Sequence, residues 1–171
     1  MKRSAGGPRT ESRLADDAAV IFERYVRTEG LKSSRVRLDL VRTIASTRGH
    51  FTAEALLQRL SRRGKVSKAT LYRTLAMMQD CQLLVSHDFG GGALYFESAL
   101  DQPHHDHLYC LGCGAIAEFT SRGIEALQAR VAADVGFELT AHSHKLYGYC
   151  ARCVDQRKTR PASTGVGGRL G

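Results

Sequence analysis

The sequence predicts an α+β fold: an N-terminal winged helix-turn-helix plus a small C-terminal α/β dimerization domain. Helical periodicity in the first half gives way to two short strand-like runs, which is typical of a winged helix. The second half carries most of the histidines and two Cys-x-x-C pairs. The excess positive charge lies in the first half, with a net charge of +7 in residues 1–98 and +1 in residues 99–171. We therefore expect a polyanionic partner for the first half and metal ions for the second.

Four amphipathic helices are expected in the first half. Apolar residues recur at helical spacing in residues 14–28, after Ser34, in residues 53–63 and in residues 67–80. A serine or threonine at the start of each of the last three helices can cap its first turn. A short turn containing Gly64 joins the third helix to the fourth, as in a helix-turn-helix.

The strand-like runs at residues 83–89 and 93–97 are joined by three glycines and predict a hairpin wing. The second half then predicts a Cys-pinched hairpin over 107–119, a helix over 121–136 and a strand over 137–150. A sheet this small would have an exposed edge and little core. A second copy of the chain would cover both, so we expect a homodimer.

The chain is expected to comprise a disordered arm (1–13), a winged-helix DNA-binding domain (14–97), a hinge (98–103), a metal-binding dimerization domain (104–153) and a disordered tail (154–171). No apolar run is long enough to span a bilayer, and the N-terminus lacks the apolar region of a signal peptide. A cytoplasmic protein is expected, and its cysteines would be kept reduced.

Two Cys-x-x-C pairs, Cys110–Cys113 and Cys150–Cys153, are separated by 36 residues. Four thiolates from two such pairs can hold a structural zinc ion in tetrahedral geometry. A thioredoxin-like redox motif is the alternative, but it would occur once, in a βαβ unit that this pattern lacks. The fifth cysteine, Cys81, is expected to be a buried, inert thiol.

A run of metal-binding residue types precedes the first cysteine pair. On a strand, side chains alternate between faces, so His105 and His107 would face one way and His104 and Asp106 the other. Two half-sites are therefore predicted. His50, Glu97 and Glu118 could complete the first, and Glu125, His142 and His144 the second. Imidazole and carboxylate without sulfur suit Fe(II), Mn(II), Zn(II), Ni(II) or Co(II). A solvated histidine-rich loop is the alternative, and His87 alone is read as a surface or packing residue.

The fourth helix carries polar and basic residues near its start, where a recognition helix meets base edges. Candidate DNA contacts there are Lys68, Thr70, Tyr72 and Arg73. Tyr72 can contact a thymine methyl group, and Arg73 a phosphate or a guanine. Further basic residues suit the phosphate backbone: Lys32, Arg35, Arg37, Arg62, Arg63 and Lys65. A solvated basic helix face is the plainer alternative.

The segments "VSKATLYRTL", "GGALYFE", "HHDHLYCLGCGAIAEF" and "LTAHSHKLYGYCARC" occur in the order and spacing of the ferric uptake regulator (Fur) superfamily, which the chain resembles over about residues 15–153. The resemblance implies a homodimeric, metal-dependent transcriptional regulator that binds double-stranded DNA at palindromic, AT-rich operators. It implies no enzymatic activity.

The resemblance also implies three metal sites and a set of DNA contacts. The structural zinc ligands would be Cys110, Cys113, Cys150 and Cys153. The regulatory ligands would be His50, Glu97, His105, His107 and Glu118. The third site would comprise His104, Asp106, Glu125 and His142. Arg37, Tyr72 and Arg73 match DNA-contacting positions of the superfamily.

The regulatory metal is expected to be Fe(II), acting in a repressor of metal-uptake genes. Zinc-sensing members of the superfamily typically carry a cysteine at the position of Glu97. Peroxide-sensing members typically carry aspartate at the position of Glu97, of Glu118 or of both. Mn(II) or Zn(II) remain alternatives. The chain departs from the usual pattern at Ser34–Arg37 and carries one extra residue between Glu97 and the histidine run.

Two other classes of function would also use metal-binding residues. A zinc hydrolase using His105, Asp106 and His107 would need an open coordination position and a general base, and the chain has no H-E-x-x-H motif. A metal store or chaperone would need no basic winged helix. DNA binding that depends on metal distinguishes the regulator from both.

Overall fold

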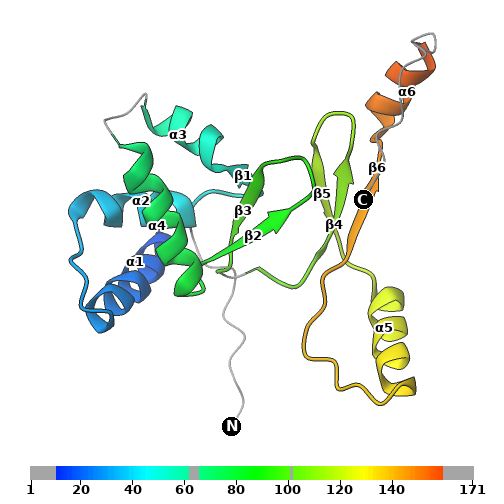
Figure 1. Ribbon diagram of the computed structural model, residues 1–171, viewed down its shortest axis with the longest axis horizontal. Helices are drawn as coiled ribbons and strands as arrows, with labels where there is room; N and C mark the ends of the chain where they lie inside the picture. The colour runs from blue at the N-terminus through cyan, green and yellow to red at the C-terminus, as the bar shows by residue number, and fades with distance from the viewer. Residues whose placement is uncertain (1–10, 62–65, 101, 160–171) are drawn as a thin grey trace. The chain divides into compact units, whose positions relative to one another are not determined.

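The computed structural model describes residues 11–61, 66–100 and 102–159. The chain divides into two compact units, Met1–Pro103 and His104–Gly171, and each is described by itself (Figure 1). In the described part of the chain, no helix is long and apolar enough to cross a membrane.

The first unit is a helix-turn-helix with a hairpin wing. Its elements are α1 (Glu11–Thr28), α2 (Arg35–Ala45), β1 (Phe51–Thr52), α3 (Ala53–Ser61), α4 (Lys68–Asp80), β2 (Leu84–Asp88) and β3 (Leu94–Ser98). The three strands form an antiparallel sheet in the order β1-β3-β2. The predicted mixed fold with a winged helix is confirmed.

The predicted caps lie where the sequence puts them. The side chain of Ser34 accepts a hydrogen bond from the amide of Arg37, and the side chain of Ser67 accepts one from the amide of Thr70. The hydroxyl of Thr52 accepts from the amide of Ala55 over 3.2 Å. Each cap satisfies an amide that the first helical turn leaves unpaired.

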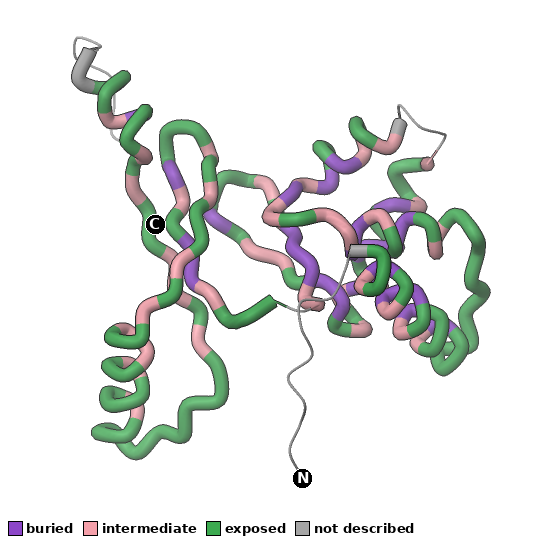
Figure 2. Tube along the Cα trace, turned by 180° about the vertical axis from the view of Figure 1, so that it is seen from behind, coloured by how far each residue is buried: buried purple, intermediate pink, exposed green. Residues whose placement is uncertain are grey.

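A single apolar core holds α4 in place. Phe22 of α1, Val41 and Ile44 of α2, and Leu71 and Met78 of α4 are fully buried. The buried stripe on these helices is visible in Figure 2. Because Leu71, Leu75 and Met78 recur at helical spacing, the intervening positions of α4 face outward. The packing thus decides which face of α4 is free for a partner.

The second unit contains β4 (Asp106–Cys110), β5 (Ile116–Phe119), α5 (Arg122–Asp134), β6 (Lys145–Gly148) and α6 (Ala151–Thr159). The sheet order is β5-β4-β6, with β4 antiparallel to β5 and parallel to β6. Among the described residues, β5 and β6 are therefore edge strands.

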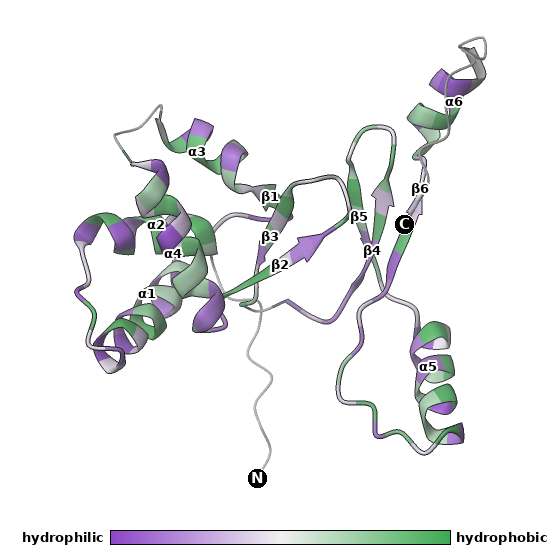
Figure 3. Cartoon of the chain, in the orientation of Figure 1, coloured by the Kyte–Doolittle hydropathy of each residue, from purple (hydrophilic) through white to green (hydrophobic). Residues whose placement is uncertain are grey.

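The second unit has almost no apolar core of its own. Its only buried residues of hydrophobic type, among those described, are Cys110 and Cys153, and α5 buries no residue. Val135 and Phe137 are 72% and 73% exposed. Figure 2 shows this unit mainly in the exposed and intermediate colours, and Figure 3 shows hydrophobic residues along α5.

Three sequence-based expectations differ from the structure. Residues 11–13, assigned to the disordered arm, form the first turn of α1. The tail assigned from residue 154 is helical up to Thr159, because α6 continues past the second cysteine pair. The strand expected over 137–150 spans only Lys145–Gly148, since the earlier residues form no ladder. The predicted contacts of Arg62, Arg63 and Lys65 lie outside the described residues.

Candidate metal centres

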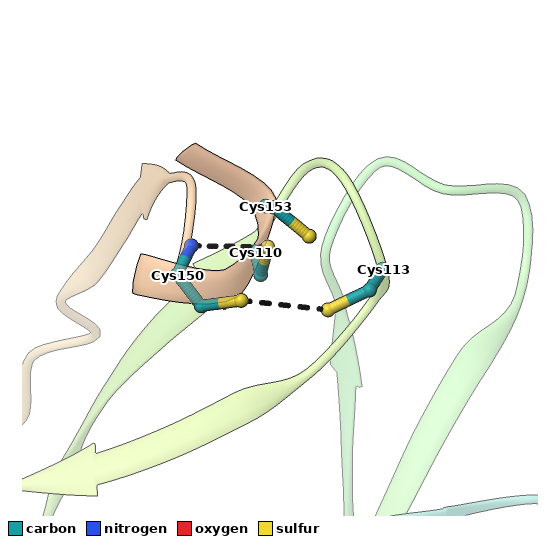
Figure 4. A group of neighbouring side chains, drawn as sticks. All are labelled: Cys110, Cys113, Cys150 and Cys153. Atoms are coloured by element: carbon teal, nitrogen blue, oxygen red, sulfur yellow. Dashed lines mark hydrogen bonds between the residues drawn. The ribbon is translucent and has the colours of Figure 1, made fainter. Parts of the chain in front are cut away.

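Four cysteine sulfurs converge where the two Cys-x-x-C pairs meet. Cys110 ends β4, and Cys113 lies in the turn before β5. Cys150 directly precedes α6, and Cys153 lies in its first turn. The four sulfurs lie within 4.8 Å of one another, and Figure 4 shows them facing one another. Cys113 Sγ and Cys150 Sγ are 3.8 Å apart. This arrangement fits the tetrahedral thiolate site of a structural zinc ion.

The protein backbone already stabilises one thiolate of this group. The amide of Cys150 donates a hydrogen bond to Cys110 Sγ over 3.2 Å. This bond is the main reason why the pKa of the Cys110 thiol is lowered to about 6. Burial has the opposite effect on Cys153 and raises its pKa to about 12. The neighbouring Arg152 has a raised pKa because its side chain hydrogen-bonds the sulfur of Cys113.

The turn of the first pair requires glycine at position 112. A Cβ atom at Gly112 would lie 2.9 Å from Cys153 Sγ and 3.0 Å from Cys153 Cβ. Cβ atoms in proteins essentially never lie within 3.0 Å of a heavy atom from a distant residue, so a side chain here would push the second cysteine pair away. Gly112 therefore permits the close approach of the two pairs.

A second group lies between β4, α5 and the loop before β6. His104 Nε2 and His142 Nε2 lie 3.2 Å and 3.4 Å from Glu125 Oε1. Both nitrogens lie 3.7 Å from Asp106 Oδ1. For bonds of about 2 Å, ligands of one tetrahedral ion lie roughly 3.3–3.6 Å apart. The four predicted residues of the third site are therefore brought together at distances that suit a divalent ion.

The carboxylate of Asp106 is the most deeply buried group of this second cluster. Its side chain is 1% exposed, and its Oδ2 has no hydrogen-bond partner among the described residues. A buried carboxylate without a partner is costly. A bound cation would supply the missing partner, so the donor set fits a metal.

The first unit places three potential ligands side by side. Glu97 of β3 is buried, with Oε1 2.5 Å from His87 Nε2 and Oε2 3.4 Å from His50 Nε2. The ring of Phe89 lies against both histidines, with centroids 6.4 Å from His50 and 5.9 Å from His87. The carboxylate of Glu97 is thereby held between two imidazoles.

The second unit presents the remaining regulatory candidates on one face of its sheet. The rings of His105 and His107 lie 4.9 Å apart, between centroids. Glu118 of β5 is the cross-strand partner of His107 of β4. The alternation expected for the histidine run is confirmed, because His104 and Asp106 lie together in the other cluster.

The candidate DNA contacts lie at the start of α4, in the first turn of α2 and just before α2. Lys68, Tyr72 and Arg73 are exposed, and Lys68 Nζ lies 5.6 Å from the centre of the Tyr72 ring. The Tyr72 hydroxyl donates to Glu54 Oε1, which raises the pKa of Tyr72 and lowers that of Glu54. Arg37 Nη1 donates to the carbonyl of Lys32 over 2.9 Å. These contacts order the side chains of Tyr72 and Arg37.

Comparison with known proteins decides which family has this arrangement. A model of the "Ferric uptake regulator family" matches residues 28–147, well over half of the chain. The chain belongs to the ferric uptake regulator family. It is a metal-responsive transcriptional regulator, as the sequence-based resemblance predicted.

Relatives of this Fur-family protein span most of its length. The ferric uptake regulation protein of Campylobacter jejuni is 37% identical over 139 residues, or 80% of this chain and 88% of that protein. The ferric uptake regulation protein of Escherichia coli strain K12 is 41% identical over 128 residues, or 74% and 86%. The structure of the Helicobacter pylori ferric uptake regulator covers 85% of this chain and 97% of its own, with a TM-score of 0.77 at 23% identity. That last likeness shows the fold.

His87 of this Fur-family protein packs against Glu97, one of the candidate regulatory ligands. The sequence predicts a surface or packing residue here, and the side chain does pack: it is 13% exposed and its ring stacks on Phe89. The contact with Glu97 is the feature that the sequence analysis did not predict. The pairing register of the β2–β3 hairpin explains this contact. His87 pairs with Tyr95 and Val85 with Glu97, so His87 and Glu97 are diagonal neighbours on one face of the sheet.

Proposed function

We propose that this Fur-family regulator is an Fe(II)-dependent repressor of metal-uptake genes. The observation that carries the proposal is the carboxylate of Glu97, which is buried between His50 and His87. Glu118 provides a second carboxylate beside His107. Ligation by imidazole and carboxylate without cysteine suits Fe(II) and Mn(II). The relatives from Campylobacter jejuni and Escherichia coli named above are both called ferric uptake regulation proteins.

The proposed regulatory ligands come from both sides of the hinge. His50 and Glu97 belong to the first unit, and His105, His107 and Glu118 to the second. A divalent ion supplies a positive charge that all five donors can share. Ligation of one ion by both units would hold them at a fixed angle. Without the metal ion, the hinge would become ordered only when the protein binds DNA. A coupling of about 1–3 kcal/mol would change DNA affinity roughly 5- to 150-fold.

We infer that α4 reads the operator. Its buried face is fixed by Leu71, Leu75 and Met78, and its exposed start carries Lys68, Tyr72 and Arg73. Arg73 can reach a guanine or phosphate, while Lys32 and Arg37 suit the phosphate backbone. Two copies of α4, related by a two-fold axis, would match the half-sites of a palindrome, for which we propose AT-rich sequences.

We propose that the protein is a homodimer, because the second unit exposes many apolar side chains. Exposed apolar residues of its sheet, α5 and the following loop have no cover in one chain, among them Leu108, Leu127, Val131, Phe137 and Tyr147. A hollow of about 290 Å³ lies among residues of β4, β5 and β6. A second copy would bury these side chains and an exposed sheet edge together. Because the regulator acts where its DNA is, we propose that it works in the cytoplasm.

Two further metal sites complete the proposal. Cys110, Cys113, Cys150 and Cys153 would hold structural Zn(II), which would replace the missing apolar core of the second unit. His104, Asp106, Glu125 and His142 would hold an ion at the third site. The distances between their donor atoms, 3.2–3.7 Å, support that assignment.

Fluorescence anisotropy with a labelled AT-rich palindrome tests the regulatory site. The full-length protein is titrated under anaerobic conditions with Fe(II), with Mn(II), with Zn(II) and with chelator. We expect metal to tighten DNA binding at least about fivefold. Glu97→Ala and His105→Ala should lose this gain. Glu138→Ala, which removes an exposed carboxylate elsewhere in the second unit, is the matched control.

Equal DNA affinity in chelator and in each metal would overturn the regulatory proposal. If Zn(II) tightens DNA binding at a far lower free concentration than Fe(II) does, the protein is a zinc sensor instead. Absence of DNA binding at every metal load would favour a metal store or an enzyme.

A further inference from the structure

Buried side-chain atoms without a hydrogen-bond partner gather in one part of the second unit. Among the described residues they are Asp106 Oδ2, Glu125 Oε1, Gln128 Oε1, His142 Nε2 and His144 Nδ1. All five are oxygens or imidazole nitrogens that can offer a lone pair to a cation. Three belong to the proposed third metal site. The sequence offers His144 as a possible member of the second half-site, but the third site proposed above does not include it.

His144 faces the side of the Asp106 carboxylate that the other histidines leave open. Asp106 Oδ1 lies 3.7 Å from the Nε2 atoms of His104 and His142. Asp106 Oδ2 lies 3.8 Å from His144 Nδ1. That separation is too long for a hydrogen bond. It is close to the roughly 3–3.6 Å between two donors that share an ion at bond lengths of about 2.1 Å.

The backbone and ring of His144 are held by the sheet that also carries Asp106. The carbonyl oxygen of His144 accepts a hydrogen bond from the amide of His107 over 3.2 Å. Its ring meets the ring of Phe119 edge-on, with centroids 6.1 Å apart. Phe119 is the cross-strand partner of Asp106. The imidazole of His144 is therefore positioned by β4 and β5.

We propose that His144 binds, through Nδ1, the same ion as His104, Asp106, Glu125 and His142. This inference rests on the proposed third site and deepens it. The site then has five protein donors, three imidazoles and two carboxylates. Structural zinc sites are almost always four-coordinate, so five donors favour an ion that accepts five or six ligands, such as Fe(II) or Mn(II).

Cobalt titration of the full-length, zinc-containing protein tests the inference. Glu97→Ala and His105→Ala are introduced first, so that the regulatory ligands do not compete. In this background we compare His144→Ala, His142→Ala and Ser143→Ala, which changes the exposed residue between the two histidines. Calorimetry gives affinity and stoichiometry. Proton NMR of the Co(II) form counts the paramagnetically shifted, exchangeable ring N–H signals, one for each bound imidazole.

The expected result is one Co(II) ion per chain at this site with three shifted ring N–H signals. His144→Ala should retain the ion with two signals and an affinity at least about tenfold weaker. Ser143→Ala should match the background. Two signals in the background protein, unchanged in His144→Ala, would overturn the ligand role of His144 and leave the third site in place. If the background protein binds no more cobalt than the His142→Ala variant does, the third site itself is overturned.

Discussion

The backbone amide of Cys150 donates a hydrogen bond to Sγ of Cys110, 40 positions away in the sequence, and this bond joins the two Cys-x-x-C pairs. The contact links the end of β4 to the start of α6, so the tetracysteine group ties together both ends of the second unit. Because this unit buries so little apolar surface, its stability should depend on zinc.

Cys153→Ser should therefore abolish zinc binding and unfold the second unit, while the first unit, with its own core, stays folded. Elemental analysis measures the zinc content, and hydrogen exchange measures the protection of each unit. Cys81→Ser is the control, because the half-buried Cys81 lies outside the tetracysteine group. A second unit that keeps its protection after zinc loss would contradict this prediction.

Zinc affinity at the tetracysteine site should rise with pH. In the metal-free protein the pKa of Cys153 is raised to about 12, so this thiol must release a proton when zinc binds near pH 7. One released proton corresponds to about a tenfold gain in affinity per pH unit. The pKa of Cys110 is lowered to about 6, so its proton competes with zinc only as the pH falls below that value. Competition with a chelator between pH 5 and pH 8 measures the slope, and a flat profile would refute the prediction.

Gly112→Ala should weaken zinc binding, because its Cβ would lie 2.9 Å from Cys153 Sγ. Separation of the two cysteine pairs should speed the release of zinc to a chelator at least about tenfold. Gly123→Ala in α5 is the matched control, since its Cβ would meet only Ser121 Oγ, at 3.9 Å. Equal release rates in the two variants would show that the turn tolerates a side chain.

Glu54 should titrate below its usual range because the hydroxyl of Tyr72 donates to its carboxylate. A carboxyl group with a lowered folded-state pKa stabilises the protein above its unfolded pKa. This contribution is lost as the pH falls through the folded pKa. Tyr72→Phe should return the pKa of Glu54 towards its ordinary value, as measured by NMR titration of the carboxyl carbon. Tyr25→Phe, which removes a hydrogen bond to Asp80 instead, should leave Glu54 unchanged.

His87→Ala should weaken activation of DNA binding by metal, because His87 holds one oxygen of Glu97. Loss of a residue that orients a ligand typically costs 10- to 100-fold in metal affinity. The measurement is the metal concentration at which anisotropy of the labelled palindrome reaches half its maximum. The control is DNA affinity in chelator, which should match that of the unchanged protein. A shift below twofold would mean that Glu97 is oriented without His87.

The amino-acid sequence by itself determined the helices of the first unit, their capping residues and the tetracysteine group. These features rest on local periodicity and short-range spacing, which the chain carries in any fold. The split of the histidine run also followed from local geometry, since side chains on a strand alternate. Residues 137–144 show the limit of that reasoning, because alternation predicted a strand where the backbone forms no ladder.

Only the tertiary structure decided which partners meet across long distances. His87 reaches Glu97 because β2 and β3 pair in one register, and a shift of one residue would have turned their side chains to opposite faces. His144 faces Asp106 because β6 lies parallel to β4. Burial then distinguishes a ligand from a surface residue. The sequence shows that a carboxylate is present at position 106, and only packing leaves one of its oxygens buried without a partner.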